Sequence, residues 1–153
     1  NVSPHQLRQE DFVPMVSAIV AETHCDPAWL VLELTESSLI VDDSASIELI
    51  DALRALGVGI ALDDFGTGYA SLSYLRRFPL DYVKIDRSFI SGTDRMDEDD
   101  AIIAAITAMS HTLKLSVVAE GVETEEQLLR VKALGCDASQ GYLHGRAAAL
   151  ESG

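Results

Sequence analysis

Short apolar runs alternate with amphipathic segments along most of the chain. The apolar runs predict strands over residues 29–36, 58–64, 81–86, 115–121 and 136–142. The amphipathic segments predict helices over residues 10–23, 46–57, 69–78, 100–113 and 125–135, and the acidic run 94–100 is interpreted as a loop leading into a helix. Strands that alternate with helices in this way indicate one α/β domain with a parallel sheet and helices outside it.

Four of the predicted strands carry one charged side chain near the carboxyl end. Successive residues of a strand face opposite sides, so the leucines of residues 30–34 face the helices and Glu33 faces away. By the same alternation, Asp63, Lys84 and Glu120 lie opposite the apolar faces of their own strands. In a βα barrel that second face points inward, and the carboxyl ends of the strands form the active site. We therefore expect these four side chains to converge at one mouth.

Clustered carboxylates favour hard divalent cations such as Mg²⁺ or Mn²⁺. Asp63 and Asp64 are adjacent and would repel each other, and a bound cation makes the pair favourable. As neighbours in a strand they are expected to point in different directions, so that each serves one of two ions or the pair bridges them. Lys84 and Glu120 would then position or polarise a water beside a phosphate. These residue types indicate metal-dependent phosphoester hydrolysis, and they suit an enolase-type proton abstraction equally well.

Net charge and the length of the apolar runs limit which ligands and surroundings the chain can have. A net charge of −14 with only 11 Lys and Arg residues argues against a DNA or RNA polymer as ligand, while cations could still bridge a small anion to the carboxylates. The longest apolar run, 101–109, is too short to span a bilayer, and no signal peptide is recognisable, so we expect a cytoplasmic segment without membrane contact. Cys25 and Cys136 match no metal or redox spacing and are interpreted as reduced core thiols.

Five sequence motifs follow one another along nearly the whole chain. They are NVSPHQL (1–7), LELTES (32–37), LDDFGTGYASLSYLRRFPLDYVKIDRSFI (62–90), VVAEGVET (117–124) and GCDASQGYLHGR (135–146). In content, order and spacing they resemble the EAL domain family, the cyclic di-GMP phosphodiesterases of bacteria. The resemblance implies a TIM-like (β/α)₈ barrel of EAL type that hydrolyses cyclic di-GMP to linear pGpG with two Mg²⁺ or Mn²⁺ ions.

The resemblance also implies roles for individual residues. The positions that match the family's metal ligands are Asn1, Glu33, Asp63, Asp64 and Glu120. Those that match groups acting on the nucleophilic water or at the binuclear site are Lys84, Glu120 and Asp64. Substrate and loop positions are Glu123, which holds the DDFGTG loop in the family, Gln140 near the site, and the loop residues Gly66, Thr67 and Gly68.

In the family, the DDFGTG loop and the short helix after it build a dimer interface that couples dimerisation to metal binding. The resemblance therefore implies a homodimer. It also implies attached sensory or GGDEF domains in the parent protein, which can be anchored in a membrane while this domain stays in the cytoplasm.

The chain departs from the family at both ends. The name-giving Glu-Ala-Leu segment and the strands before NVS are absent, and a complete barrel needs about 250 residues. We therefore expect residues 1–153 to be a partial EAL domain of about five βα units, unstable or inactive in isolation. At the other end, His144 stands where the family usually has an aromatic residue, and no proline follows Arg146.

Two further functions are compatible with the sequence. A catalytically inactive EAL domain can act as a cyclic di-GMP receptor or as a protein-interaction module, usually after losing metal ligands or the DDFGTG loop. Here the downstream motifs are intact, which favours the enzyme. From the residues alone, an unrelated two-metal phosphoesterase stays an alternative.

Overall fold

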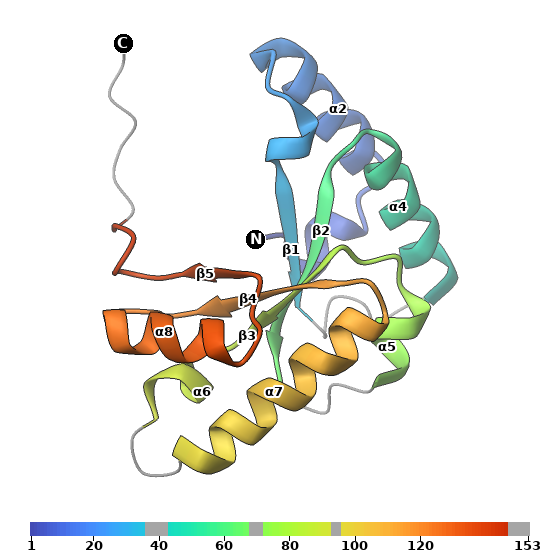
Figure 1. The fold of residues 1–153 in the computed structure, drawn as a ribbon. Coiled ribbons are helices and arrows are strands. Elements are labelled where there is room, and N and C mark those ends of the chain that lie inside the picture. The colour runs from blue at the N-terminus through green and yellow to red at the C-terminus, as the bar shows by residue number, and fades with distance from the viewer. Residues whose placement is uncertain (36–42, 68–71, 93–95, 147–153) are drawn as a thin grey trace.

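A strongly twisted sheet with helices along its outer side forms the body of the molecule (Figure 1). The computed structural model describes residues 1–35, 43–67, 72–92 and 96–146. Its strands are β1 (Val31–Thr35), β2 (Gly59–Phe65), β3 (Tyr82–Ile85), β4 (Ser116–Glu120) and β5 (Ala138–Gln140). Neighbouring strands are all parallel and follow chain order across the sheet. This is the strand order of a βα barrel wall, as the sequence predicts.

Each pair of consecutive strands is joined through at least one helix, so the carboxyl ends of all strands lie at the same edge. The helices are α1 (Pro4–Leu7), α2 (Phe12–Thr23), η1 (Pro27–Trp29), α4 (Asp43–Ala55), α5 (Leu72–Arg77), α6 (Arg87–Ser91), α7 (Met96–Thr112) and α8 (Glu125–Ala133). Every predicted strand and helix has a counterpart, although the start of the predicted helix 69–78 lies outside the described residues.

Three features differ from the sequence-based expectations. Residues 96–100 begin α7, so their interpretation as a loop is wrong; Asp97, Glu98 and Asp99 fill the first turn, where negative charge suits a helix N-terminus. The short helices α1, η1 and α6 were not predicted, because none is long enough to show a helical period. Cys25 is exposed and therefore is not a core thiol.

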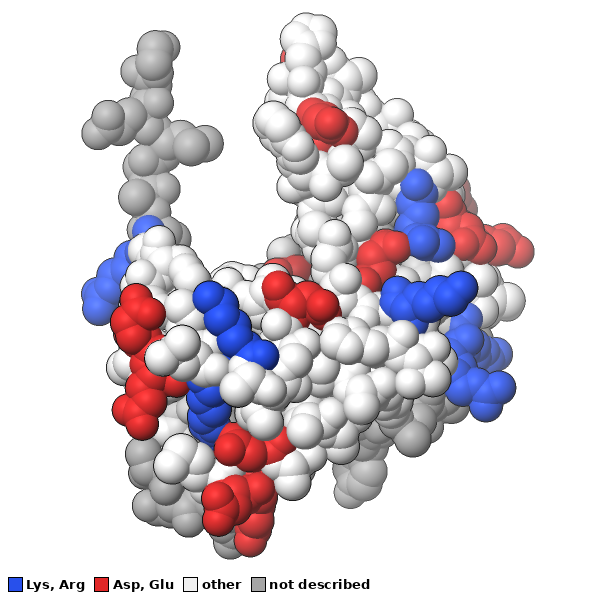
Figure 2. Space-filling model, viewed as in Figure 1, with Lys and Arg blue, Asp and Glu red and all other residues white. Residues whose placement is uncertain are grey.

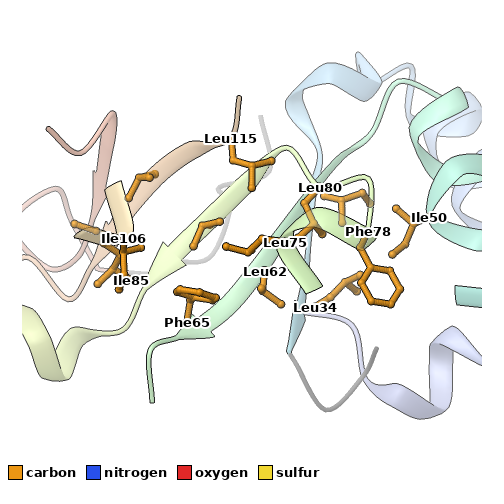
Figure 3. Packing of buried hydrophobic residues seen from close by; sticks show 14 of the residues in the cluster. Leu34, Ile50, Leu62, Phe65, Leu75, Phe78, Leu80, Ile85, Ile106 and Leu115 are labelled. Carbon is orange, nitrogen blue, oxygen red and sulfur yellow. The ribbon is translucent and has the colours of Figure 1, made fainter. Parts of the chain in front are cut away.

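The core lies between the outer face of the sheet and the helices (Figure 3). Leu34, Leu62 and Ile85, one from each of three neighbouring strands, are at most 1% exposed. They belong to the apolar faces that strand alternation predicts. Burying such a side chain contributes about 1.5–3 kcal/mol, so this row fixes which face of each strand meets the helices. The charged residues between them are thereby directed to the other face.

The outer strands of the sheet are β1 and β5. Beyond β1 there is one isolated bridge, between Val2 and Leu34, in which the Val2 N–H donates to the Glu33 carbonyl at 2.9 Å. Trp29 and Val31, beside this edge, are 82% and 38% exposed. In the described residues this bridge joins the N-terminal segment to β1, and Val2, Phe12 and Val16 anchor it further by packing into the core. Within the described residues, no helix has the length and apolarity needed to cross a membrane.

Candidate active site

Lys84 stands at the centre of a cluster of carboxylates contributed by three other strands. Its ammonium forms ion pairs with Glu33 of β1 and Glu120 of β4, and lies 3.5 Å from Asp63 Oδ1 of β2. The Lys84 side chain is only 5% exposed, whereas the two glutamates are each 20% exposed. The structure thus brings together the four side chains that strand alternation places on one face.

A β-bulge places the two adjacent aspartates on the same side. Leu62 pairs with Val83 and Phe65 with Ile85, so Asp63 and Asp64 together oppose the single residue between Val83 and Ile85. Asp64 adopts the left-handed conformation, with φ 56°. An extra residue of this kind interrupts the alternation of side chains along a strand.

The consequence of the bulge is a compact group of three carboxylates. One oxygen each from Asp63, Asp64 and Glu120 lie within 4.8 Å of one another. The expectation that the two aspartates point in different directions is therefore wrong, since the bulge turns Asp64 back toward the cluster. Three carboxylates this close can share one or two cations.

Hydrogen bonds from Thr67 and close packing at Gly66 both fix the turn after the bulge. The Thr67 hydroxyl donates to the Asp64 carbonyl at 2.9 Å, and the Thr67 N–H donates to the same oxygen at 3.4 Å. Gly66 has φ 101°, and a Cβ there would lie 2.9 Å from the Phe89 ring. Gly66 and Thr67 thus fix the backbone that carries Asp64. Gly68, predicted to belong to the same loop, lies outside the described residues.

The electrostatics of the cluster follow from burial and crowding. Burial, and then the charge of Asp63, raise the pKa of Asp64. Burial also raises the pKa of Glu120, and the bond to Lys84 offsets only part of that rise. For Lys84, burial lowers the pKa, but the bonds to Glu120 and Glu33 outweigh it and the pKa is raised. The ion pairs of the described residues set one ammonium, Lys84, within a group of four carboxylates, so further positive charge would stabilise the cluster.

The residues present fit a divalent cation. Asp63 Oδ1 is buried and has no hydrogen-bond partner; at 3.5 Å, the Lys84 ammonium makes an electrostatic contact rather than a well-formed hydrogen bond. A buried carboxylate oxygen without a donor is costly, and a cation would satisfy it. The donor set is purely oxygen, which is what Mg²⁺, Mn²⁺ and Ca²⁺ prefer.

A cavity of about 210 Å³ adjoins the cluster at Glu120. Its lining residues, which come from the ends of β3, β4 and β5, are Arg87, Glu120, Gly121, Glu123, Gln140, Gly141 and Tyr142. The predicted site residues Glu123 and Gln140 therefore lie beside the cluster. Within the described residues, no hydrogen bond joins the Glu123 side chain to 62–67, so its role in holding that loop stays a prediction.

Asn1 lies at the outer edge of β1. The bridge between Val2 and Leu34 places it level with Glu33, and it is exposed. Arg87 and Tyr142 are site-facing residues that the sequence reasoning missed; the Arg146 guanidinium lies 4.7 Å from the centre of the Tyr142 ring. Arg87 follows β3, the strand that carries Lys84, by two residues. That position at the carboxyl end of a site strand could have marked it as a site residue.

Comparison with known proteins identifies the family. The model of the EAL domain family matches residues 1–147. The chain belongs to the EAL domain family. The fold is accordingly that of an EAL-type TIM barrel, of which this chain forms the β1–β5 wall.

Two relatives of this EAL chain come from Pseudomonas aeruginosa. The chain is 45% identical over 146 residues to the bifunctional diguanylate cyclase/cyclic di-GMP phosphodiesterase MucR, covering 95% of this chain and 21% of MucR. It is 40% identical over 146 residues to the cyclic di-GMP phosphodiesterase RocR, covering 95% of this chain and 37% of RocR. The chain therefore spans well under half the length of these relatives.

Solved EAL structures agree with the fold. The MucR phosphodiesterase in complex with c-di-GMP superposes with a TM-score of 0.86 at 45% identity, over 95% of this chain and 59% of that one. Klebsiella pneumoniae BlrP1, solved as a manganese/cy-diGMP complex, superposes with a TM-score of 0.79 at 30% identity, over 90% of this chain and 35% of that one. EAL domains have thus been solved with the cyclic dinucleotide and with a divalent metal.

Proposed function

We propose that this chain forms part of one EAL domain that hydrolyses cyclic di-GMP to linear pGpG in a metal-dependent reaction. The observation that carries the proposal is the convergence of four carboxylates and the buried Lys84 at the carboxyl ends of neighbouring strands. The activities named for MucR and RocR support cyclic di-GMP as the substrate.

Divalent cations would be held by the three carboxylates of the bulge and β4. Asp63, Asp64 and Glu120 supply the closest group of oxygens, and Glu33 and Asn1 border it. We propose two ions, Mg²⁺ or Mn²⁺, which these side chains would hold between them. When bound, such cations lower the pKa of a water and neutralise charge on a phosphate.

The remaining side chains would bind and orient the substrate. The Lys84 ammonium would donate to the attacking water or to a phosphate oxygen, as a fixed charge in a largely buried position. Glu120, which borders both the carboxylate cluster and the adjoining cavity, would accept a hydrogen bond from the attacking water and orient it. Arg87 and Gln140 would contact the nucleotide from the wall of the adjoining cavity, and Glu123 would support the loop 62–68.

Two partners follow from the same proposal. The loop that carries Gly66 and Thr67, together with α5 after it, would form the homodimer interface. The name of MucR, a bifunctional cyclase and phosphodiesterase, supports attached GGDEF or sensory domains in the parent protein. Crosslinking of the complete protein through cysteines introduced on α5 would detect the dimer.

The function is tested by incubating the complete natural protein with cyclic di-GMP and Mg²⁺ and following pGpG by chromatography. Asp63→Asn is the test variant, and Asp97→Asn, on the exposed first turn of α7, is the matched control. We expect product from the wild type and the control, and a loss of more than about 100-fold in Asp63→Asn, since a proposed metal ligand is removed. Nucleotide binding without turnover in the wild type would instead establish the receptor function.

A further inference from the structure

Two carboxylates hold the Lys84 ammonium in direct ion pairs, and a third lies close to it. An ammonium offers three N–H donors, and Lys84 faces three carboxylates: Glu33 and Glu120 in direct ion pairs and Asp63 at 3.5 Å. Its side chain is 5% exposed, so solvent cannot supply alternative partners. While Glu33 and Glu120 stay paired, at most one of the three donors, the one 3.5 Å from Asp63, can reach a water or a phosphate oxygen. The other two become available only if the glutamates separate from Lys84.

We propose that Lys84 is the counter-cation of the metal-free site and competes with divalent cations for the same carboxylates. In the metal-free protein its ammonium holds Glu33 and Glu120 together across the sheet. When cations take those carboxylates, the ammonium is released toward the reacting phosphate. This inference rests on the proposed function for the existence of the metal site, and adds that metal occupancy controls whether Lys84 is available.

Charge balance supports the competition. The ion pairs of the described residues give Glu33, Asp63 and Glu120 one cation among them, Lys84. Asp64 adds a fourth carboxylate within 4.8 Å of Asp63 and Glu120. Two divalent cations would bring the cluster from a net negative to a net positive charge while the ammonium remained nearby. Repulsion between Lys84 and the cations then opposes metal binding.

If Lys84 competes with the cations, removing it should change metal affinity in the opposite direction from removing a lysine that only supports the site. If Lys84 merely supported the site, its removal would loosen the carboxylates and weaken metal binding. If Lys84 competes with the cations, its removal destabilises the metal-free protein and tightens metal binding, because binding and displacement are reciprocally linked.

The test is a calorimetric titration of the complete natural protein with Mn²⁺, in the absence of nucleotide, for the wild type and Lys84→Met. The control is Lys132→Met, an exposed lysine on α8. We expect Lys84→Met to bind Mn²⁺ about tenfold more tightly, the effect of removing one nearby charge in a partly screened site. We also expect its metal-free melting temperature to fall and its Mn²⁺-induced rise in melting temperature to grow. The control should match the wild type in all three respects.

Unchanged or weaker Mn²⁺ binding by Lys84→Met would overturn the inference while leaving the proposed metal site intact. Absence of Mn²⁺ binding by the wild type would overturn the proposed function and the inference together. If Lys84→Met does not fold, Lys84→Gln serves as a second neutral variant. The wild type provides an independent readout: Mg²⁺ should shift the ¹⁵N resonance of the Lys84 ammonium, and an unchanged resonance at saturating Mg²⁺ would overturn the inference.

Discussion

Asp64 combines two unfavourable features in one residue. Its backbone is left-handed at φ 56°, a conformation that costs most L-residues about 1–2 kcal/mol but that Asp and Asn tolerate best. Its carboxylate faces Asp63, whose charge, after burial, raises the pKa of Asp64. The proposed metal site would account for such a position, because a cation would need the carboxylate there and stability would be exchanged for function.

Asp64→Asn separates those two contributions. Asn keeps the left-handed backbone and the shape of the side chain but removes the charge. We expect the metal-free protein to gain stability by less than about 1 kcal/mol, because Asp64 is exposed and water screens the repulsion. Mn²⁺ affinity should fall at least about tenfold. Thermal unfolding and Mn²⁺ titration measure the two effects, and a variant with unchanged Mn²⁺ affinity would remove Asp64 from the ligand set.

Gly66→Ala should damage the site through its support. Ala would adopt φ 101° with strain, and its Cβ would lie 2.9 Å from the Phe89 ring. We expect a loss of about 2–4 kcal/mol, from backbone strain and overpacking combined. Gly145→Ala is the matched control, since its φ of 134° imposes strain but no atom lies within 4 Å of the added Cβ. Equal losses of unfolding free energy in both variants would show that Phe89 does not fix this turn.

Among the secondary-structure elements, α6 receives hydrogen bonds from a side chain of α8. Arg130 is 12% exposed and donates from Nε to Asp100 at 2.5 Å, and from its terminal nitrogens to the carbonyls of Ile90 and Phe89 at 3.0 and 3.3 Å. It therefore ties the carboxyl end of α6 to α7 and α8. Because Phe89 packs at Gly66, this tie also supports the loop of the aspartates.

Arg130→Met should destabilise the protein by about 2–4 kcal/mol, since two carbonyls and a carboxylate lose their donor. Lys132→Met, on the same helix and exposed, should change the free energy of unfolding by less than about 0.5 kcal/mol. Denaturant unfolding of both variants is the measurement. Equal stability of the two would mean that the contacts of Arg130 contribute nothing net.

Asp137 gives the sheet a pH-dependent contact. Its carboxylate accepts the Val117 N–H at 2.7 Å and lies 2.8 Å from His111 Nε2, joining β4 and α7. The bond from Val117, and then that with His111, lower its pKa despite some burial. A lowered folded-state pKa means that the stabilisation is complete above the unfolded value of about 3.9 and is lost as pH falls through the folded value.

Asp137→Asn should therefore be less stable than the wild type at neutral pH. The difference in unfolding free energy should shrink as pH falls below about 4, when the wild-type carboxyl group protonates. Urea unfolding over a pH series measures this difference. A difference that stays constant down to pH 2 would show that the Asp137 charge plays no part.

At the scale of strands and helices, the sequence predicted which strand faces carry the charged residues but missed the β-bulge in β2. Alternation placed Glu33, Asp63, Lys84 and Glu120 correctly on one face, because the opposite face is apolar enough to fix each strand. The same alternation failed at Asp64, because a bulge depends on pairing with β3 and leaves no hydrophobic pattern of its own. Helix α6 was missed for a related reason: its start is set by the Asp86 cap on Ser88 N–H, at 2.9 Å, rather than by periodicity.

At the scale of the whole molecule, charge on the face shown in Figure 2 is spread rather than gathered. Figure 2 shows acidic and basic side chains interspersed over the face in view, although the chain carries a net charge of −14. Glu33, Asp63 and Glu120 are instead partly buried around Lys84. The sequence predicted this local cluster from strand phase, whereas the total charge indicated only which ligands to exclude.

The outer strands β1 and β5 make the isolated chain prone to self-association. Unpaired strand edges recruit other strands, and Val31 of β1 is 38% exposed. We expect residues 1–153 alone to aggregate or to lack activity, while the complete protein is well behaved. Size-exclusion chromatography and a pGpG assay compare the two, and a monomeric, active preparation of residues 1–153 would contradict the expectation.

The central claim is that the carboxylates of β1, β2 and β4 form a two-metal centre beside Lys84. The most direct test is an anomalous difference map from crystals of the complete protein grown with Mn²⁺ and cyclic di-GMP. We predict two manganese peaks about 3.5–4 Å apart, bound by Asp63, Asp64, Glu33 and Glu120, with the phosphate of the nucleotide next to them. No peak at these carboxylates, with the nucleotide bound, would contradict the account.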